Sequence, residues 1–381
     1  MNQIADEVAD IRALPDPGQV RRAGDRLRVR SRRRAVVAAA GVLAVVAAAA
    51  LTHPVTRATH EPIGPIDGWR VARSLDVPGS GTIVYADGAL WVVDMKSGKL
   101  TADGSAPAGE MYQIDPDSGD VLDRLPGAVG GWASVGAGAI WLSTAAGDLN
   151  ALTRVDLASH EVTRWSTSQP TQLPHGSGIA AGNLWVANSD SGDLIRMNPR
   201  THQLLQTVHL GQSVKGESPT SLVTDGSSVW ASTDDGVVWR VAGATGEKLS
   251  RLQLPIREAR LVGIDPRRHT LYAASIRGNT LVEIDADQPG TDWHGRELSV
   301  SRAADEGMLL DVAIGPDSVW AATRNPDQLL RIDPETFRIT DRMPLTGMDL
   351  ESNVAVDLAT GGGATWIRIK DKVLELRPQF G

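Results

Sequence analysis

The feature that most constrains this chain is a short aromatic motif that recurs seven times. Each copy places Trp or Tyr directly after Leu, Ile, Val or Thr and continues as a strand-like segment: ALWVVD, AIWLST, NLWVAN, SVWAST, TLYAAS, SVWAAT and ATWIRI. The aromatic residues lie 42 to 50 residues apart, at Trp91, Trp141, Trp185, Trp230, Tyr272, Trp320 and Trp366. A period of this length, built from strands alone, is typical of propeller blades with four antiparallel strands. We therefore predict an all-β, seven-bladed β-propeller over residues 66–381.

One repeat, residues 174–210, shows how a blade divides into strands. GSGIA (176–180) is the predicted innermost strand, followed by LWVAN, LIRMN and the outer strand LLQTVHL. The seventh repeat contains NVAVD, ATWIR and VLELR, but the sequence ends at Gly381 without an outer strand. The segment WRVARSLDV (69–77) resembles the outer strands, so we predict that it pairs with residues 373–377. This pairing closes the ring and leaves no sheet edge exposed.

Composition excludes several classes of function. Residues 1–34 carry nine Arg and five acidic side chains, while the whole chain has a net charge of −8, so residues 35–381 sum to −12. An acidic body does not suit a nucleic-acid partner, because phosphate groups are bound by Lys and Arg. The chain has no cysteine, which excludes disulfides, thiolate metal sites and a thiol nucleophile. We interpret the seven aromatic residues as core, not as a platform for stacked bases.

The N-terminal region predicts a membrane segment. Residues 35–52 contain no charged side chain, and 18 residues of helix span roughly 27 Å, close to the thickness of a bilayer core. Six arginines lie between Arg26 and Arg34, immediately before this segment. Positive charge on one flank places that flank in the cytoplasm. The predicted order is a basic cytoplasmic tail (1–34), a transmembrane signal anchor (35–52), a linker (53–65) and an extracytoplasmic propeller in a single-pass protein of the cell membrane.

Two interpretations of this segment compete. A cleaved signal peptide is supported by Ala48–Ala50 as a cleavage site and by residues 31–34, which partly match a twin-arginine signal. An uncleaved anchor is favoured by the long leader and by an apolar stretch longer than a usual signal core. Both interpretations export the propeller. The basic tail is expected to lie on anionic lipid, or alternatively to dock a cytoplasmic regulator.

The repeat resembles a known family. The segment PHGSGIAAGNLWVANSDSGDLIRMNPRTHQLLQTVHLG is similar to a unit of the YVTN-type, WD40-like propeller repeat, and the resemblance extends over residues 66–381. This resemblance implies the propeller fold but no single activity, because the family includes binding proteins, scaffolds and enzymes. The chain also resembles virginiamycin-lyase and lactonase propellers, which carry His and acidic residues in their central loops, and anchored actinobacterial propellers associated with extracytoplasmic-function sigma factors.

Charged residues are expected at the mouth of the central channel, where loops between blades gather. Our candidates for ligand binding are Asp94, His175, Glu217, Arg260, Glu306 and Glu351. Acidic residues recur in equivalent loops, and a ring of carboxylates with one His could act as acid and base or hold a cation. The alternative is that these are solvated loop charges paired with neighbouring Arg. Because no tight ligand spacing appears, we predict no metal and no cofactor and assign no catalytic residue.

Two functions follow from this sequence. The first is a binding or sensing module that recognises an extracytoplasmic peptide, envelope polymer or partner protein. The second is a metal-assisted lyase or lactonase that works at the channel mouth through His175 and the ring of glutamates. A purely structural scaffold is a third interpretation, which would require an exposed apolar patch on the rim.

Overall fold

In the computed structural model of this chain, all described residues belong to one compact unit, residues 61–381. The described residues are 69–77, 81–94, 109–144, 151–166, 174–189, 191–210, 219–275, 278–287, 291, 293–301, 307–345 and 356–378. The predicted tail, signal anchor and linker lie outside these ranges. Nothing within the ranges forms a helix with the length and apolar character needed to cross a bilayer.

The described residues form seven four-stranded antiparallel sheets. Blade 1 contains β2 (Ile83–Ala86), β3 (Ala89–Asp94), β4 (Glu110–Ile114) and β5 (Val121–Pro126). Blade 2 contains β6 (Trp132–Gly136), β7 (Ala139–Thr144), β8 (Ala151–Asp156) and β9 (Val162–Ser166). Blade 3 contains β10 (Pro174–Ala180), β11 (Asn183–Asn188), β12 (Asp193–Met197) and β13 (Leu204–His209).

The remaining sheets have the same order. Blade 4 contains β14 (Pro219–Thr224), β15 (Ser228–Thr233), β16 (Val237–Ala242) and β17 (Lys248–Gln253). Blade 5 contains β18 (Ala259–Asp265), β19 (Thr270–Ser275), β20 (Thr280–Asp285) and β21 (Gly295–Ser299). Blade 6 contains β22 (Met308–Ile314), β23 (Val319–Arg324), β24 (Gln328–Asp333) and β25 (Arg338–Pro344). Blade 7 contains β26 (Val356–Gly361), β27 (Ala364–Ile369), β28 (Lys372–Pro378) and β1 (Trp69–Asp76).

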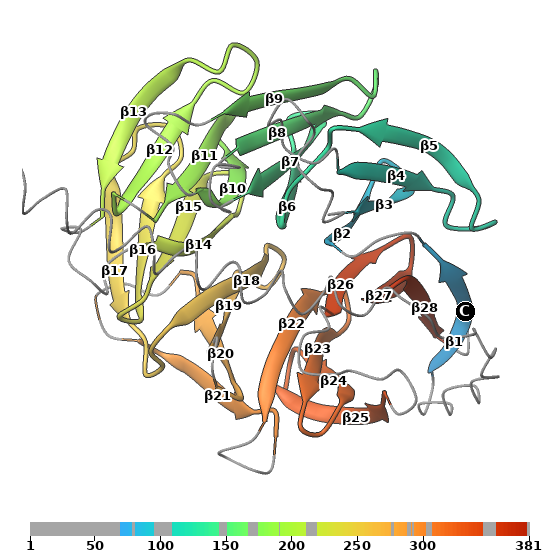
Figure 1. Cartoon of the computed structure of the whole chain (residues 1–381). Coiled ribbons are helices and arrows are strands. Elements are labelled where there is room, and N and C mark those ends of the chain that lie inside the picture. Colours follow the sequence, from blue (N-terminus) through green and yellow to red (C-terminus); the bar gives the residue numbers. More distant parts are fainter. Residues whose placement is uncertain are drawn as a thin grey trace, which may run out of the picture. The chain divides into compact units, whose positions relative to one another are not determined.

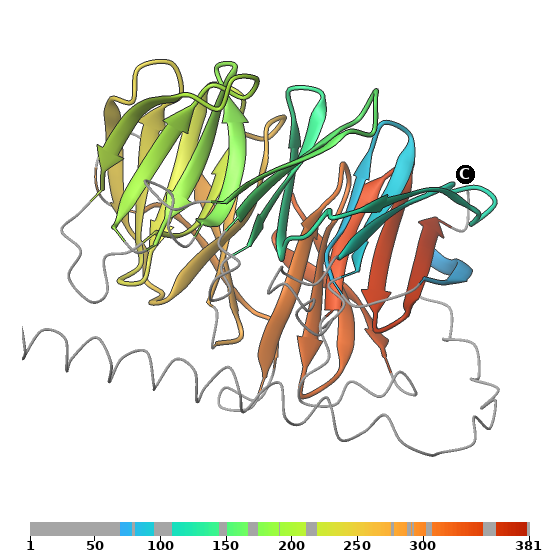
Figure 2. The ribbon, with the colours of Figure 1, turned by 45° about the horizontal axis from the view of Figure 1, so that its top comes forward.

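The seven sheets surround a common centre (Figure 1). The first strand of each blade (β2, β6, β10, β14, β18, β22 and β26) is innermost and contacts the innermost strands of both neighbouring blades, and β26 contacts β2 to complete the ring. The sheets twist from the centre to the rim, as Figure 2 shows from a tilted view. The prediction of a seven-bladed propeller is therefore confirmed.

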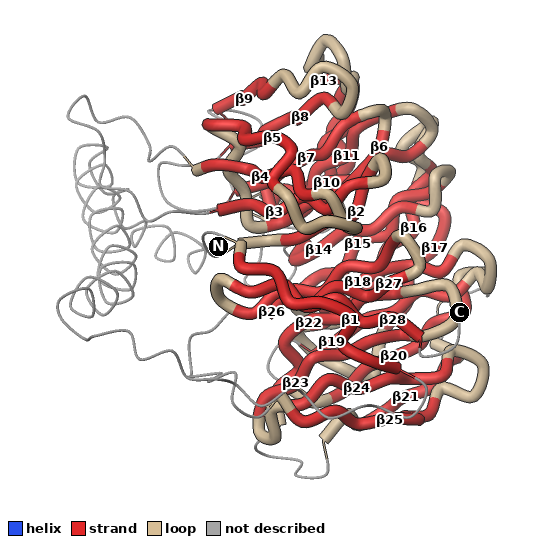
Figure 3. Tube along the Cα trace, turned by 90° about the vertical axis from the view of Figure 1, so that its right-hand side faces the viewer, coloured by secondary structure: helices blue, strands red, loops and turns tan. Residues whose placement is uncertain are grey.

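The ring is closed by the N-terminal strand, as predicted. β1 pairs with β28 in antiparallel register from Trp69 opposite Pro378 to Asp76 opposite Lys372, and the two strands run side by side in Figure 3. Beyond the strand, the amide of Val77 donates to the carbonyl of Asp371 over 2.7 Å. Blade 7 thus takes its outer strand from the opposite end of the described chain.

The seven aromatic residues of the repeat form the cores between blades. Each has a relative exposure of 1% or less. A buried indole needs an acceptor for its N–H group, and Trp91 donates to the carbonyl of Ala86 (3.1 Å) and Trp141 to that of Gly136 (3.0 Å), both within the preceding hairpin. The recurring aromatic residue therefore fills the core and also fastens the turn between the first two strands of these blades.

Glycines let the innermost strands approach one another closely. A Cβ atom on Gly136 of β6 would lie 2.7 Å from the side chain of Ile179 on β10. A Cβ on Gly263 of β18 would lie 2.4 Å from Ile314 on β22. Contacts this short do not occur between real side chains, so these positions exclude every larger residue unless the neighbouring side chain moves. Neighbouring inner strands therefore lie close together beside these two glycines.

The innermost strand of blade 7 differs from the predicted segment. The predicted segment NVAVD is residues 353–357, of which 353–355 lie outside the described residues, and the observed strand β26 (Val356–Gly361) ends four residues later than predicted. Its end is set by the hairpin at Gly362 and Gly363, which both have positive φ (61° and 72°), a conformation that glycine adopts without strain. Asp357 belongs to the predicted and to the observed strand, and it lines the channel.

Substituting Leu75 in β1 tests the closure. Leu75 is 8% exposed and packs with Val373 and Trp366 of the same blade. We expect Leu75→Ala to lower the free energy of unfolding by about 2–4 kcal/mol, because it leaves a cavity in this core. The measurement is urea unfolding of the full-length protein. Arg70→Ala, at an exposed position of the same strand, should change stability by only about 0.5 kcal/mol. Equal effects of the two substitutions would show that β1 does not belong to the cooperative unit.

Candidate functional site

The innermost strands enclose a cavity of about 440 Å³, here called the channel cavity, and all seven strands contribute to its lining. Each blade has four antiparallel strands, so the chain returns to the face on which the blade began. All seven innermost strands therefore run in the same direction along the channel. Residues near the starts of these strands gather at one end of the cavity, and residues near their ends gather at the other.

The two ends of the cavity differ in chemistry. Trp132, Arg260 and Asp357 lie near the strand starts, which we call the charged end. Ile264 and Ile314 lie at or near the strand ends, which we call the apolar end. A molecule in the channel would therefore meet charged side chains at one end and uncharged, mainly apolar side chains at the other.

Serine side chains line the middle of the cavity and link neighbouring blades. The hydroxyl groups of Ser134 and Ser177 lie 3.2 Å apart, joining β6 to β10. The Ser221 hydroxyl accepts a 2.6 Å hydrogen bond from the amide of Leu261, joining β14 to β18. These bonds fix the spacing of the inner strands, so the cavity wall is rigid where it is polar.

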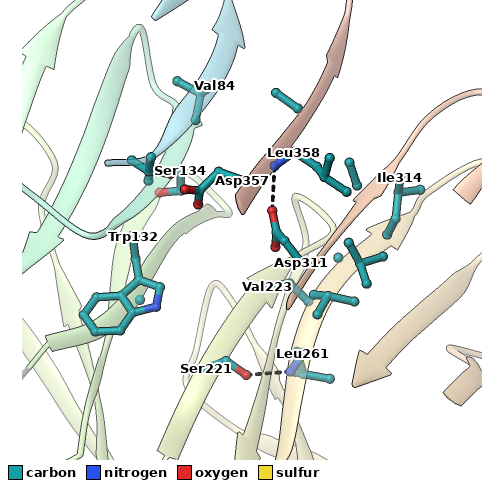
Figure 4. Close-up of a pocket in the computed structure, with 18 of the residues that line it drawn as sticks. Val84, Trp132, Ser134, Ser221, Val223, Leu261, Asp311, Ile314, Asp357 and Leu358 are labelled. Carbon is teal, nitrogen blue, oxygen red and sulfur yellow. Dashed lines mark hydrogen bonds between the residues drawn. The ribbon is translucent and has the colours of Figure 1, made fainter. Parts of the chain in front are cut away.

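Three charged residues line the channel cavity within the described part of the chain: Arg260, Asp311 and Asp357. The Asp311 carboxylate on β22 accepts a 2.7 Å hydrogen bond from the amide of Leu358 on β26. Leu358 directly follows Asp357, so this bond holds the two carboxyl groups on adjacent strands near each other. In Figure 4 the Asp311 carboxyl group points toward the Leu358 amide, and the Asp357 carboxyl group points toward the side on which Ser134 is labelled.

Both carboxyl groups have raised pKa values. Burial raises the pKa of Asp311 to about 6, although the nearby Arg260 guanidinium lowers it. Burial and the neighbouring Asp311 raise the pKa of Asp357 to about 7, against the opposing effects of Arg368 and Arg260. Like charges this close cannot both ionise easily, so the pair retains a proton close to neutral pH.

Arg368 lies in the wall behind Asp357. It is its cross-strand partner in the β26–β27 ladder, and it is 2% exposed. Its Nη1 atom donates to the carbonyls of Gly81 (2.9 Å) and Val93 (2.8 Å) in blade 1. Burial lowers the pKa of Arg368, while Asp357 and Asp94 raise it. The guanidinium thus joins the last blade to the first and contributes positive charge behind the carboxyl pair.

Of the predicted site residues, some line the channel cavity, some do not, and others lie outside the described residues. Arg260 is the second residue of β18 and lines the channel cavity. Asp94 is the last residue of β3 and is 1% exposed, in the wall and not among the lining residues. His175 belongs to β10, but its side chain lies outside the description, and Glu217, Glu306 and Glu351 lie outside the described residues. The ring of glutamates therefore stays a prediction.

Asp311 and Asp357 were not among the predicted site residues. The prediction drew only on segments expected to be loops, whereas Asp311 and Asp357 belong to segments expected to be inner strands. One signal was present: an acidic residue within an otherwise apolar inner strand, in MLLDVAI and NVAVD. A carboxyl group is rarely placed on a buried strand without a partner or a function. Within the described residues, no group of three or more His, Asp or Glu side chains could hold a metal ion.

Comparisons with known proteins support the fold. No protein-family model matches the sequence, and no curated protein matches it. Among solved structures, the chain is similar to selenomethionine-substituted virginiamycin B lyase from Staphylococcus aureus, with a TM-score of 0.61 and 14% sequence identity. The similarity covers 80% of this chain and 98% of that one. At this identity the likeness shows a shared propeller fold.

The carboxyl pair predicts how stability depends on pH. The pKa of Asp357 is raised from its ordinary 3.8 to about 7, so the folded state binds more protons than the unfolded chain between these values. The resulting stabilisation is complete below the ordinary pKa and is lost as the pH rises through the folded one. A tenfold difference in proton affinity between the two states corresponds to on the order of 1.4 kcal/mol.

We expect Asp357→Asn to flatten this dependence. Between about pH 5 and pH 8, the free energy of unfolding of the unmodified protein should fall relative to that of the variant. The measurement is urea unfolding at both pH values. Asp317→Asn, at an exposed turn position, serves as the control and should follow the unmodified protein. A relative gain in stability of the unmodified protein at the higher pH would contradict the raised pKa.

Proposed function

We propose that this chain is a membrane-anchored, extracytoplasmic binding module of the YVTN type, whose ligand occupies the channel cavity. The observation that carries this proposal is a cavity of about 440 Å³ with charged and hydroxyl groups converging at its polar part. Small-molecule sites have volumes of roughly 300–1,000 Å³ and few, well-placed polar groups. The uncharged segment 35–52 and the arginines before it support the anchor and the orientation.

A second function is favoured by the carboxyl pair. A carboxyl group with a pKa of about 7 can donate or accept a proton near neutral pH, as general acid–base catalysis requires. The similar solved structure is named a lyase. The alternative proposal is therefore a lyase or lactonase reaction in the channel, with Asp311 and Asp357 as the acid–base pair. Its metal-assisted form would depend on His175 and on the glutamates outside the described residues.

Narrowing the channel tests the proposed binding site. Ser134 lines the cavity, so Ser134→Phe places an aromatic ring in it. We expect the full-length protein to enrich at least one small molecule from an extract of its host's cell envelope, measured by equilibrium dialysis and mass spectrometry. The Ser134→Phe variant should not enrich this molecule, because the site is filled.

The control for this experiment is Thr207→Phe on the exposed face of the outer strand β13, which adds the same ring away from the channel. This variant should enrich the same molecule as the unmodified protein. Enrichment that survives Ser134→Phe in a folded protein, or that is lost in Thr207→Phe, would rule out the channel cavity as the binding site.

The anchor predicts where the protein is found in the cell. The full-length chain should sediment with membranes and resist extraction by alkaline carbonate, because residues 35–52 cross the bilayer. Protease added to intact cells without an outer barrier should degrade the propeller and leave the tail. A mature protein shorter by about 50 residues would support the cleaved signal peptide instead.

A further inference from the structure

The Arg260 guanidinium and the Asp357 carboxyl group line one cavity without being paired to each other. Within the described residues, neither side chain forms a hydrogen bond or salt bridge. Both interact electrostatically with nearby ionisable groups. This differs from other charged residues of the chain, such as Arg296, which donates to the Glu283 carboxylate over 2.6 and 2.9 Å. Charged groups that face a cavity without partners are available to a ligand.

The three lining charges occupy consecutive inner strands. Arg260 lies on β18, Asp311 on β22 and Asp357 on β26, so the carboxyl pair and the guanidinium lie side by side along the wall. A simple cation at the carboxyl pair would be repelled by Arg260, and a simple anion at Arg260 would be repelled by the carboxyl pair. A molecule that carries both charges on neighbouring atoms satisfies all three residues.

Building on the proposed binding function, we propose that the charged end of the channel takes a small zwitterion of the α-amino-acid type. Its ammonium group lies at Asp357 and Asp311, and its carboxylate lies at Arg260. A guanidinium binds a carboxylate through two parallel hydrogen bonds, which gives this contact direction as well as charge. The remainder of the ligand extends along the channel, beside Trp132 and toward the apolar end.

The carboxyl pair makes this binding proton-linked. Within the described residues, the charged groups that act on Asp357 are Asp311, Arg368 and Arg260. The ammonium group of the ligand replaces the proton that the pair retains, so binding should release a proton into solution. Affinity should consequently fall as the pH drops and the pair becomes neutral.

Equilibrium dialysis of the full-length protein against a mixture of the twenty common L-amino acids, at millimolar concentration, tests the proposal. At least one amino acid should be retained, whereas its decarboxylated amine and its N-acetyl derivative should not. Asp357→Asn and Arg260→Gln should each weaken retention at least about tenfold, a loss equivalent to about 1.4 kcal/mol. Asp317→Asn and Arg251→Gln, at exposed positions, are the matched controls and should bind normally.

Two outcomes would overturn the zwitterion proposal. In the first, the decarboxylated amine binds as tightly as the amino acid, which would show that Arg260 does not bind a carboxylate of the ligand. In the second, no amino acid is retained, although Ser134→Phe abolishes capture of some other molecule from the envelope extract. The second outcome leaves the proposed binding function intact, whereas an absence of any captured molecule contradicts both. Circular dichroism of each variant confirms that a loss of binding is not a loss of folding.

Discussion

The backbone pairing of β1 with β28 is the interaction on which the rest of the structure depends. Six blades are each complete in sequence, but the seventh has only three strands until residues 69–76 join it. Without that strand, β28 would present an unpaired edge. The contact between β26 and β2, which completes the ring, would then be made by a blade that lacks its outer strand. The channel cavity exists only in the closed ring, because all seven inner strands contribute to its wall.

The seam between blade 7 and blade 1 also carries part of the charge of the site. Arg368 reaches from blade 7 to two carbonyl groups of blade 1, and it is the cross-strand neighbour of Asp357. Its guanidinium favours ionisation of that carboxyl group, whereas burial and Asp311 oppose it. Opening the seam would therefore alter the protonation of the carboxyl pair as well as the shape of the cavity. Closure of the fold and chemistry of the site are physically coupled through this one side chain.

The sequence was sufficient for the fold because the aromatic motif repeats in register. Trp91 and its six equivalents mark one strand in every blade, and a missing outer strand implies the partner that replaces it. The functional site was predicted less completely, because Arg260 was among the predicted residues but Asp311 and Asp357 were not. A repeat pattern identifies which residues form an inner strand, but the position of a side chain along the channel depends on where the strand ends. For β26, the end is set by the glycine hairpin after Gly361, four residues beyond the end of the predicted segment. Arg260 was predicted because it was assigned to the loop before β18, of which it is the second residue.

The direction of the strands fixes where the ends of the propeller emerge. β26 starts at the charged end of the channel, so β28, two strands later, also runs away from that end and finishes at Pro378 on the opposite face. Trp69 is paired with Pro378, so β1 begins on that same opposite face. Any segment that continues the chain from Trp69 or Pro378 therefore leaves the propeller on the face away from the charged end of the channel.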